Sequence, residues 1–323
     1  MDVDQLQQLL NAHGFKGTAS FKRIPTGKFN ETYRCLIDRM GRNEAVILRI
    51  APPPITGFLF YERGMMAQEP GLHQLIRERT SLPVPAILVY DNSRTLINRD
   101  FLIMEHLTGT PLSESYVSPA DQDKVYEQVG RYLKELHTHC TTTQYGYLGE
   151  HKCMKPASTW KDAFHVMWNK LVDDITKCNV YDFREADCAR QALELHQPIF
   201  KRDVSASLLH MDIWGQNILI DNNSKITGIL DWDRALWGDP EIEFAVLDYC
   251  GFNVPAFWRG YGEQHERNTE ANIRMLFYHL YEIQKYLVIW TLRAGSLSRV
   301  QSYKQYSLRA IDKLLQIAAE MFS

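Results

Sequence analysis

Two neighbouring segments decide the fold: residues 210–217 are His-Met-Asp-Ile-Trp-Gly-Gln-Asn, and residues 226–233 are Ile-Thr-Gly-Ile-Leu-Asp-Trp-Asp. The first places Asp212 five residues before Asn217, and the second places Asp231 fourteen residues after Asn217. Apolar residues that favour strands follow Asn217 and precede Asp231, and a polar turn separates the two runs. We therefore expect a β-hairpin that returns Asp231 towards Asn217.

These residue types at this spacing suit the transfer of a phosphoryl group. Such transfer needs the attacking hydroxyl, the phosphate and Mg²⁺ to be held in line, and little covalent chemistry from the protein. Asp212 could accept the hydroxyl proton, while Asn217 and Asp231 offer the oxygen ligands that Mg²⁺ prefers. The alternative is that they are only turn and cap residues, which Asp and Asn often are. Their joint occurrence beside two expected strands favours the catalytic interpretation.

The composition is that of a globular protein and excludes several classes. The 323 residues carry a formal net charge of -3 without a basic stripe, so we expect no nucleic-acid partner. The sequence has no signal peptide and no stretch resembling a membrane span, so we expect a cytoplasmic protein without a membrane partner. The six cysteines form no C-x-x-C pair, which favours reduced thiols over a zinc site.

The first third of the chain is rich in expected strands and the remainder in expected helices. After a short helix at 4–12, strands are expected at 32–37, 45–50, 86–90 and 101–105. The later expected elements are helices at 121–139, within 160–201, at 271–292 and at 303–322, with strands at 217–220 and 226–230. Helical spacing at 61–79 is interrupted by Pro70, which indicates two helices or one kinked helix.

Residues 208–245 closely resemble the catalytic core of the aminoglycoside phosphotransferase-like kinases, a superfamily that includes antibiotic, choline, homoserine and fructosamine kinases. The resemblance covers most of the chain and is weakest over 150–205 and 250–323. It implies an α+β, protein-kinase-like fold of two lobes, with an antiparallel sheet in the N-terminal lobe and a mainly helical C-terminal lobe.

The same resemblance assigns roles in the quoted motif. It implies that Asp212 is the catalytic base, that Asn217 and Asp231 bind Mg²⁺, and that His210 braces the loop. It also divides the chain into three parts: a nucleotide-binding lobe at 1–105, a hinge at 106–111, and a helical lobe at 112–323 that holds the catalytic loop and the acceptor site.

The hinge is expected to bind the nucleotide base. Main-chain groups near Met104, Glu105 and Leu107 would make these contacts, as the resemblance implies. We expect ATP as the cofactor. Main-chain contacts do not distinguish adenine from guanine, so GTP stays an open alternative.

The nucleotide phosphates are expected beside the loop that joins the first two strands. Gly27 and Lys28 lie in this loop, which resembles the phosphate-covering loop of kinases but holds one glycine instead of three. A simple hairpin turn explains it as well. Arg49 ends an apolar strand where protein kinases carry a lysine, and its guanidinium can bind phosphate and a carboxylate together. Glu69 is the expected carboxylate, with Glu62 as the alternative.

Residues 221–248 hold seven acids and two bases, so we expect an acidic cleft for a cationic acceptor such as an aminoglycoside. Four side chains are candidates for acceptor contacts, each with packing or surface exposure as the alternative: Asp233, Trp214, Tyr281 and Glu282. Asp239 precedes Pro240 and is expected first to cap a helix and second to brace the catalytic loop.

The resemblance thus predicts an ATP-dependent kinase that phosphorylates a hydroxyl of an aminoglycoside-like antibiotic or a related metabolite, with antibiotic resistance as one role. Two alternatives stay open: a kinase-like nucleotide-binding protein without catalysis, and a choline-, homoserine- or fructosamine-type metabolite kinase. Non-catalytic relatives usually lose one of Asp212, Asn217 and Asp231, and all three are present here. We expect a monomer or a homodimer.

Overall fold

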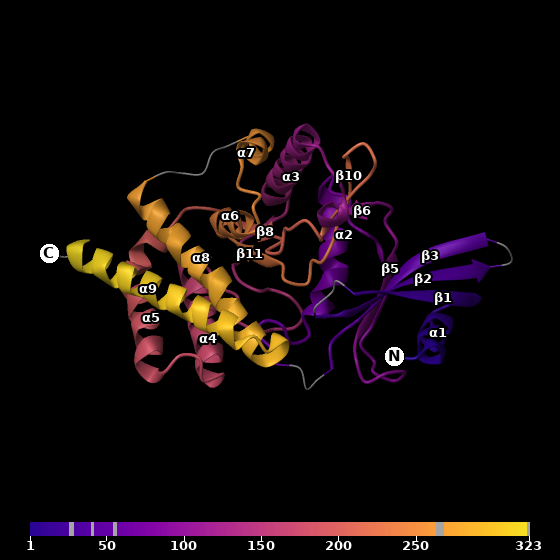
Figure 1. Ribbon diagram of the computed structural model, residues 1–323, viewed down its shortest axis with the longest axis horizontal. Helices are drawn as coiled ribbons and strands as arrows, with labels where there is room; N and C mark the ends of the chain where they lie inside the picture. Colours follow the sequence, from indigo (N-terminus) through magenta and orange to yellow (C-terminus); the bar gives the residue numbers. More distant parts are fainter. Residues whose placement is uncertain (26–28, 40–41, 54–56, 263–267, 322–323) are drawn as a thin grey trace.

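The computed structural model describes residues 1–25, 29–39, 42–53, 57–262 and 268–321. It shows a β-rich part, built from the first third of the chain, beside a larger helical part (Figure 1). The N-terminus lies in the β-rich part, and the last helix ends at the far side of the helical part.

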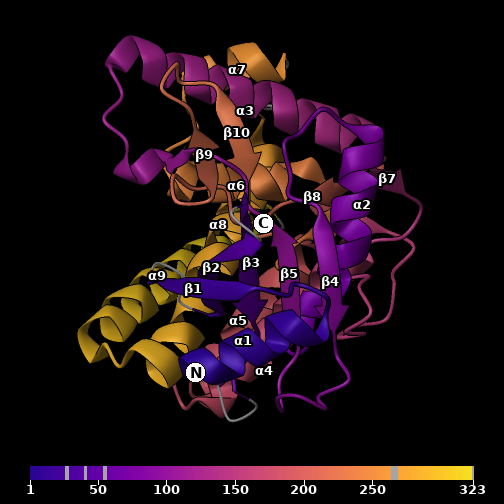
Figure 2. The same ribbon diagram turned by 90° about the vertical axis from the view of Figure 1, so that its right-hand side faces the viewer.

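The β-rich part is a five-stranded antiparallel sheet in the order β1-β2-β3-β5-β4. Its strands are β1 Thr18–Ile24, β2 Glu31–Arg39, β3 Arg42–Ile50, β4 Ile87–Asp91 and β5 Phe101–Glu105. Helix α1 (Val3–Ala12) lies along the sheet (Figure 2) and buries Leu6, Leu9 and Leu10 against it. The sequence pattern predicted β2, β3, β4 and β5 at nearly these bounds but gave no range for β1.

Between β3 and β4 of the sheet, Pro70 lies at the start of a helix instead of kinking one. A 3-10 turn, η1 (Met65–Gln68), precedes helix α2 (Glu69–Arg79), and Pro70 lies in the first turn of α2. Proline is tolerated at that position because its missing N–H would have no intrahelical partner. Glu69, the first residue of the helix, is fully buried.

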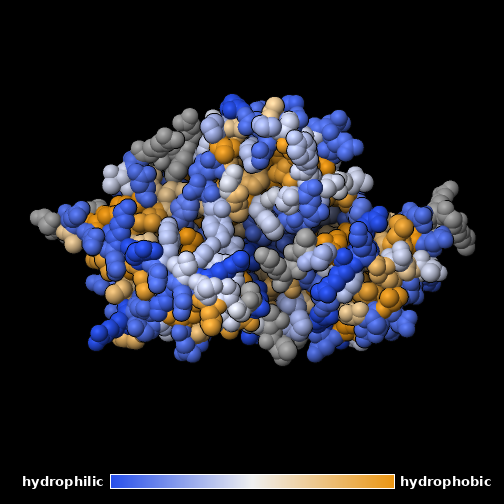
Figure 3. All heavy atoms as spheres, in the orientation of Figure 1, coloured by the Kyte–Doolittle hydropathy of each residue, from blue (hydrophilic) through white to orange (hydrophobic). Residues whose placement is uncertain are grey.

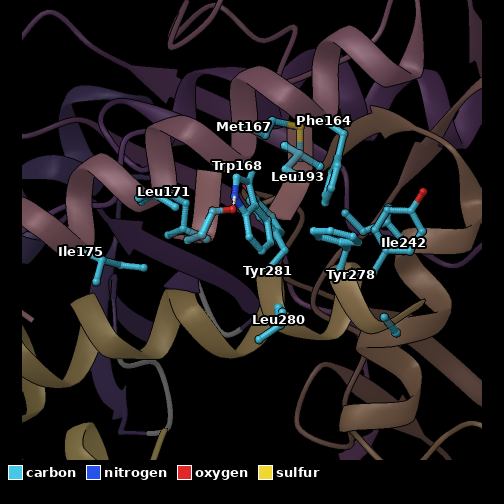
Figure 4. Close-up of a cluster of buried hydrophobic side chains, with 14 of the residues drawn as sticks. Phe164, Met167, Trp168, Leu171, Ile175, Leu193, Ile242, Tyr278, Leu280 and Tyr281 are labelled. Atoms are coloured by element: carbon cyan, nitrogen blue, oxygen red, sulfur yellow. Dashed lines mark hydrogen bonds between the residues drawn. The ribbon is translucent and has the colours of Figure 1, made fainter. Parts of the chain in front are cut away.

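The helical part contains α3 Pro119–His139, α4 Trp160–Lys177, α5 Phe183–His196, α6 Pro240–Tyr249, α7 Pro255–Tyr261, α8 Thr269–Ile289 and α9 Leu297–Met321. Shorter turns are η2 Leu112–Glu114, η3 Gln197–Phe200 and the π-helical turn η4 Trp290–Ala294. Side chains of α4, α5 and α8 meet in one apolar cluster, which includes Phe164, Trp168, Leu193 and Tyr281 (Figure 4). Among the described helices, none is both long and apolar enough to cross a bilayer.

Two small antiparallel sheets in the helical part position the motif residues. One contains β6 (Thr110–Pro111), β9 (Ile218–Ile220) and β10 (Ile226–Ile229), and the other contains β7 (Thr141–Thr142), β8 (Ala206–Leu209) and β11 (Leu236–Gly238).

The pairing of β8 with β11 brings two loops together. Leu209, the last residue of β8, pairs with Leu236, the first residue of β11. Because the strands are antiparallel, residues 210–217 and residues 231–235 leave the same end of this ladder. The sequence marked β9 and β10, which form a local hairpin, but not β8 and β11, which are joined through a longer stretch of chain.

Helices α3 and α7 approach so closely that two positions require glycine. A Cβ atom on Gly130 would lie 2.1 Å from the main-chain oxygen of Phe257, and one on Gly260 would lie 1.9 Å from that of Glu127. Both distances are far below van der Waals contact, so a larger residue must push the helices apart.

We expect Gly130→Ala to lower the free energy of unfolding by about 1–3 kcal/mol, because overpacking forces backbone shifts. Gly71→Ala is the matched control, since nothing lies within 4 Å of its added Cβ. Alanine there should raise the free energy of unfolding by up to about 1 kcal/mol, from helix propensity. Urea unfolding of both variants measures the contrast, and equal effects of the two would contradict the close α3–α7 contact.

Candidate active site

The Arg49 guanidinium lies at the junction of the two parts, buried among three carboxylates. Its Nη1 donates to Glu69 Oε2 at 2.6 Å, and its Nη2 donates to Asp233 Oδ2 at 2.7 Å and to Asp231. Arg49 comes from β3, Glu69 from the start of α2, and the two aspartates from the segment after β10. The structure therefore brings together Arg49 and its expected partner Glu69.

The two aspartates of this cluster have opposite electrostatic surroundings. Burial raises the pKa of Asp233 well above its usual value, and the negative charge of Asp231 adds to the effect. Burial also works to raise the pKa of Asp231, but the charges of Arg49 and Arg234 outweigh it and leave that pKa lowered. Asp231 therefore stays an anion, which is the form that a metal ligand needs.

Asp233 does not lie at a solvated rim, which the sequence left open as the alternative to an acceptor contact. Only 4% of its side chain is exposed, against 37% for Asp231. Besides Arg49, Asn30 donates to its Oδ2 at 3.0 Å, and Gln68 donates to its main-chain oxygen at 2.5 Å. Asp233 is buried because it holds Arg49 in place, and sequence reasoning missed the roles of Asn30 and Gln68.

Asp212 and Asn217 contact each other across the loop after β8. Asn217 Nδ2 donates to the main-chain oxygen of Asp212 at 2.9 Å and lies 3.3 Å from its Oδ2. These two contacts involve the amide nitrogen of Asn217, which leaves its amide oxygen able to bind a metal ion. Leu230 N donates to Asn217 O at 2.9 Å, so the next residue, Asp231, leaves the hairpin beside Asn217. One amide oxygen and one ionised carboxylate form a donor set that fits Mg²⁺.

His210 ties this loop to the end of the hairpin. Its Nδ1 accepts from the Asp212 N–H at 3.1 Å, and its Nε2 lies 2.9 Å from the Leu230 carbonyl oxygen. Because a carbonyl only accepts, Nε2 carries the proton and the ring is neutral. The expected bracing role of His210 thus has a geometric basis, because one imidazole links the main chain of Asp212 to that of Leu230, the residue before Asp231.

Glu243, which the sequence reasoning missed, holds the other side of the catalytic loop. It lies fully buried in α6, and its Oε1 accepts from the N–H groups of His210 and Met211, both at 2.8 Å. Its Oε2 lies 2.7 Å from Nε2 of His137, a residue of α3. In the sequence, the only local signal for this role of Glu243 is an acid among apolar residues in the first turns of a helix.

Asp239 caps α6 as expected, since its side chain accepts from Glu241 N at 3.0 Å. It also pairs with Arg202 at 2.5 Å, and burial raises its pKa to about 6. The second expected role, bracing the catalytic loop, belongs to Glu243 instead.

The acids of residues 221–248 are used within the fold and form no free acidic surface. Their partners in the described structure are Arg49 for Asp231 and Asp233, Arg202 for Asp239, Arg202 and Arg274 for Glu241, His137 for Glu243, His279 for Asp248, and turn N–H groups for Asp221. The charge argument for a cationic acceptor therefore loses its basis.

Arg234 is a further cation at the catalytic loop that sequence reasoning did not single out. Its Nη1 lies 3.7 Å from Asp212 Oδ1, and its Nη2 lies 3.9 Å from Glu62 Oε1. Glu62, the alternative partner of Arg49, instead accepts from Arg293 Nη2 at 2.9 and 2.8 Å. Asp212 Oδ2 faces Asn217 and Oδ1 faces Arg234, so Arg234 lies on the side of the base away from Asn217.

The expected nucleotide-binding residues are only partly placed. Gly27 and Lys28 lie outside the described residues. Met104 and Glu105 end β5 at the junction, and Leu107 begins the connection to the helical part. Glu105 N donates to Ala86 O at 2.9 Å, so this N–H already has a partner within the β-rich part.

Two of the expected acceptor contacts are core residues instead. Tyr281 is fully buried in the α4–α5–α8 cluster (Figure 4). Glu282 is buried beside it and pairs with Lys285 one turn later in α8. Both belong to the buried residues of α8, which also include the polar Gln284 and Lys285. Trp214 is half-buried in the catalytic loop and remains a candidate.

The hydrogen bonds of Glu243 predict that Glu243→Ala makes the catalytic loop more mobile, because the N–H groups of His210 and Met211 lose a shared acceptor. We expect hydrogen exchange at these two amides to accelerate and the free energy of unfolding to fall by about 3 kcal/mol or more. Glu243→Gln is the control, because its amide oxygen can still accept from both. Slow exchange in Glu243→Ala would contradict the bracing role.

Comparison with known proteins gives matches in sequence and in structure. The model of the phosphotransferase enzyme family matches residues 20–276. A probable ketoamine kinase of Vibrio parahaemolyticus is 27% identical over 65% of this chain and 69% of its own length. Acyl-CoA dehydrogenase family member 11 of Pongo abelii is 24% identical over 80% of this chain, which spans only 31% of that protein's length.

Solved structures confirm the kinase-like fold class expected from the sequence. A putative fructosamine-3-kinase from Thermobifida fusca matches with a TM-score of 0.69 at 15% identity, covering 98% of this chain and 100% of that one. A ternary complex of an aminoglycoside phosphotransferase with AMP-PNP and hygromycin B matches with a TM-score of 0.65 at 18% identity, covering 97% and 98%. Because the family model matches most of its length, this chain belongs to the phosphotransferase enzyme family.

Proposed function

We propose that this small-molecule kinase transfers the γ-phosphoryl group of ATP to a hydroxyl of a metabolite, with Asp212 as the catalytic base. The supporting observation is the joint placement of Asp212, Asn217, Asp231 and Arg49 at the junction of the two parts. Asp212 keeps 20% of its side chain exposed, so an acceptor hydroxyl can reach it. The proposal places the reaction in the cytoplasm, where ATP is the common donor.

In the proposed reaction, the acceptor oxygen forms a bond to the γ-phosphorus while the bond from that phosphorus to the β–γ bridging oxygen breaks. The hydroxyl proton passes to Asp212, and ADP leaves with the electron pair of the broken bond. Asn217 orients the Asp212 carboxylate, and His210 and Glu243 fix the loop that carries it.

The phosphate end is held by residues from both parts. Mg²⁺, when bound with the nucleotide, supplies positive charge to the phosphate oxygens, and Asn217 and Asp231 would hold it. Arg49 offers its guanidinium to phosphate while Glu69 and Asp233 hold it in position. Adenine as the base rests on the AMP-PNP bound by the aminoglycoside phosphotransferase.

We favour a metabolite over a polycationic aminoglycoside because the acids of residues 221–248 already have partners within the fold. The similarity to a probable ketoamine kinase is in line with this choice. A screen for ADP release against ketoamines, sugars, amino alcohols and aminoglycosides tests it. Turnover of aminoglycosides above all metabolites would overturn this part of the proposal and restore an antibiotic-resistance role.

Arg49→Lys should weaken binding of the magnesium nucleotide by roughly tenfold or more, because a point charge cannot hold phosphate and several carboxylates at once. Arg49→Ala should in addition lower the free energy of unfolding by about 3–5 kcal/mol, since it leaves buried carboxylates unpaired. Nucleotide titration and urea unfolding separate the two effects. An unchanged nucleotide dissociation constant in Arg49→Lys would refute the phosphate role.

Asp212→Asn and Asp231→Asn should fail in different ways. Loss of the base should cut turnover by about 10²–10⁴-fold while leaving magnesium nucleotide affinity nearly unchanged. Asp231→Asn should lose turnover and also require much more Mg²⁺, because a neutral amide replaces an anionic ligand.

Titrating Mg²⁺ at fixed nucleotide distinguishes the two variants. A magnesium defect confined to Asp212→Asn would mean that the two roles are exchanged. Full activity in both variants would refute the kinase mechanism and favour a nucleotide-binding protein without catalysis.

A further inference from the structure

A cavity of 380 Å³ lies where the β-rich and helical parts meet. Its walls come from the end of β3, the segment before α2, the β4–β5 connection and the loop between α3 and α4. Hydrophilic residues gather at this junction on the face shown in Figure 3. A cavity of this size holds a small organic molecule.

Three arginines line the cavity, and two of them have carboxylate partners. Arg94 Nε donates to Asp100 Oδ1 at 2.9 Å, and Arg99 pairs with Glu31. Arg63 is exposed, and among the described residues no carboxylate lies within 4 Å of it. Arg63 therefore brings a positive charge to the cavity that the fold does not neutralise.

The acids in the cavity wall are occupied by other groups. Glu62 accepts from Arg293 and, at 2.8 Å, from Leu59 N. Asp100 accepts from Arg94 and, at 3.3 Å, from the Tyr90 hydroxyl. Neither carboxylate is paired with Arg63, so the uncompensated charge of the cavity is positive.

The Arg63 guanidinium carbon lies 5.2 Å from the centroid of the Phe58 ring, and His151 adds a group whose polar atoms have no partner. Both of its ring nitrogens are buried and have no hydrogen-bond partner among the described residues. Burial lowers the pKa of His151 to about 4, so the ring is neutral near pH 7, with one donor and one acceptor. A buried polar atom without a partner costs about 1–3 kcal/mol, which a bound polar ligand would relieve.

The cavity is connected to the proposed reaction centre through its own wall. Glu62 lines the cavity and lies 3.9 Å from Arg234, which lies 3.7 Å from Asp212. Asn30 also lines the cavity and donates to Asp233. Two residues of the cavity wall, Glu62 and Asn30, are therefore in contact with Arg234 and Asp233 of the proposed reaction centre.

We infer that the cavity binds the distal part of the phosphoryl acceptor and that this part carries an oxyanion, a carboxylate or a phosphate, held by Arg63. A guanidinium can bind either group with two parallel hydrogen bonds. His151 would contact a neutral polar group of the same molecule. This inference rests on the proposed function, because it names the acceptor class for that site, and it replaces the cationic acceptor expected from sequence.

The first test measures binding without turnover, with inorganic phosphate as the probe and the nucleotide site saturated with magnesium AMP-PNP. Thermal stabilisation as a function of phosphate concentration gives the affinity. We expect Arg63→Ala to lose at least about tenfold in affinity and Arg63→Lys to lose less. The matched control is Arg184→Ala, which removes an exposed arginine of α5 outside the cavity wall. Equal affinities in Arg63→Ala and Arg184→Ala would overturn the inference.

The second test compares acceptors in matched pairs: sugar phosphates with free sugars, and hydroxy acids with their amides, beside amino sugars as the cationic class. The anionic member of each pair should have the higher kcat/KM. Arg63→Ala should raise its KM by roughly tenfold or more with little change in kcat, and should leave the neutral member unaffected. Preference for amino sugars, or equal losses for both members of a pair, would refute the assignment.

The two tests separate failure of this inference from failure of the proposed function. Phosphate binding that depends on Arg63, without turnover of any acceptor class, would refute the kinase proposal and leave the anion site standing. Turnover of neutral acceptors without Arg63-dependent phosphate binding would leave the kinase standing and refute the anion site.

Discussion

The ion cluster around Arg49 is the contact on which the rest of the site depends. One buried guanidinium joins a strand of the sheet, the first residue of α2 and the segment after β10. Burying several carboxylates together is costly unless their charge is paired, and the raised pKa of Asp233 lets that carboxyl keep a proton. Asp231 keeps its negative charge, so in the proposed mechanism it is the carboxylate of this cluster that would hold Mg²⁺ at the junction of the two parts.

A second constraint acts on the catalytic loop from the helical side. Glu243 accepts from two successive N–H groups of the loop and contacts His137, while His210 links the loop to the hairpin. The loop is therefore fixed both to α6 and to β10, although its own residues form no regular structure. Holding Asp212 in one position this way reduces the reorganisation needed when the acceptor hydroxyl arrives.

The sequence predicted the elements whose pattern is local and left out those that depend on distant partners. Strands β2, β3 and β5 have recognisable apolar patterns, and the motif spacing singled out Asp212, Asn217 and Asp231, which the structure places near one another. Strands β8 and β11 pair across more than twenty residues of intervening chain instead of a tight turn, so only the folded structure reveals that they align the two loops. A buried acid such as Glu243 cannot be assigned from sequence, because its partners lie on other elements and two of them are main-chain groups.

The same distinction explains why the acids of residues 221–248 do not predict the charge of the acceptor. Acids near the motif are counted easily in the sequence, but each has a hydrogen-bond or ion-pair partner in the described structure, and several of these partners are arginines from elsewhere along the chain. In the cavity wall, the charge without a carboxylate partner among the described residues is that of Arg63, on the segment before α2, which the motif does not include. In the proposed mechanism, the reacting groups and the group that selects the acceptor would thus come from separate parts of the chain. Substitutions before α2 would then change the preferred acceptor charge while Asp212, Asn217 and Asp231 keep their geometry.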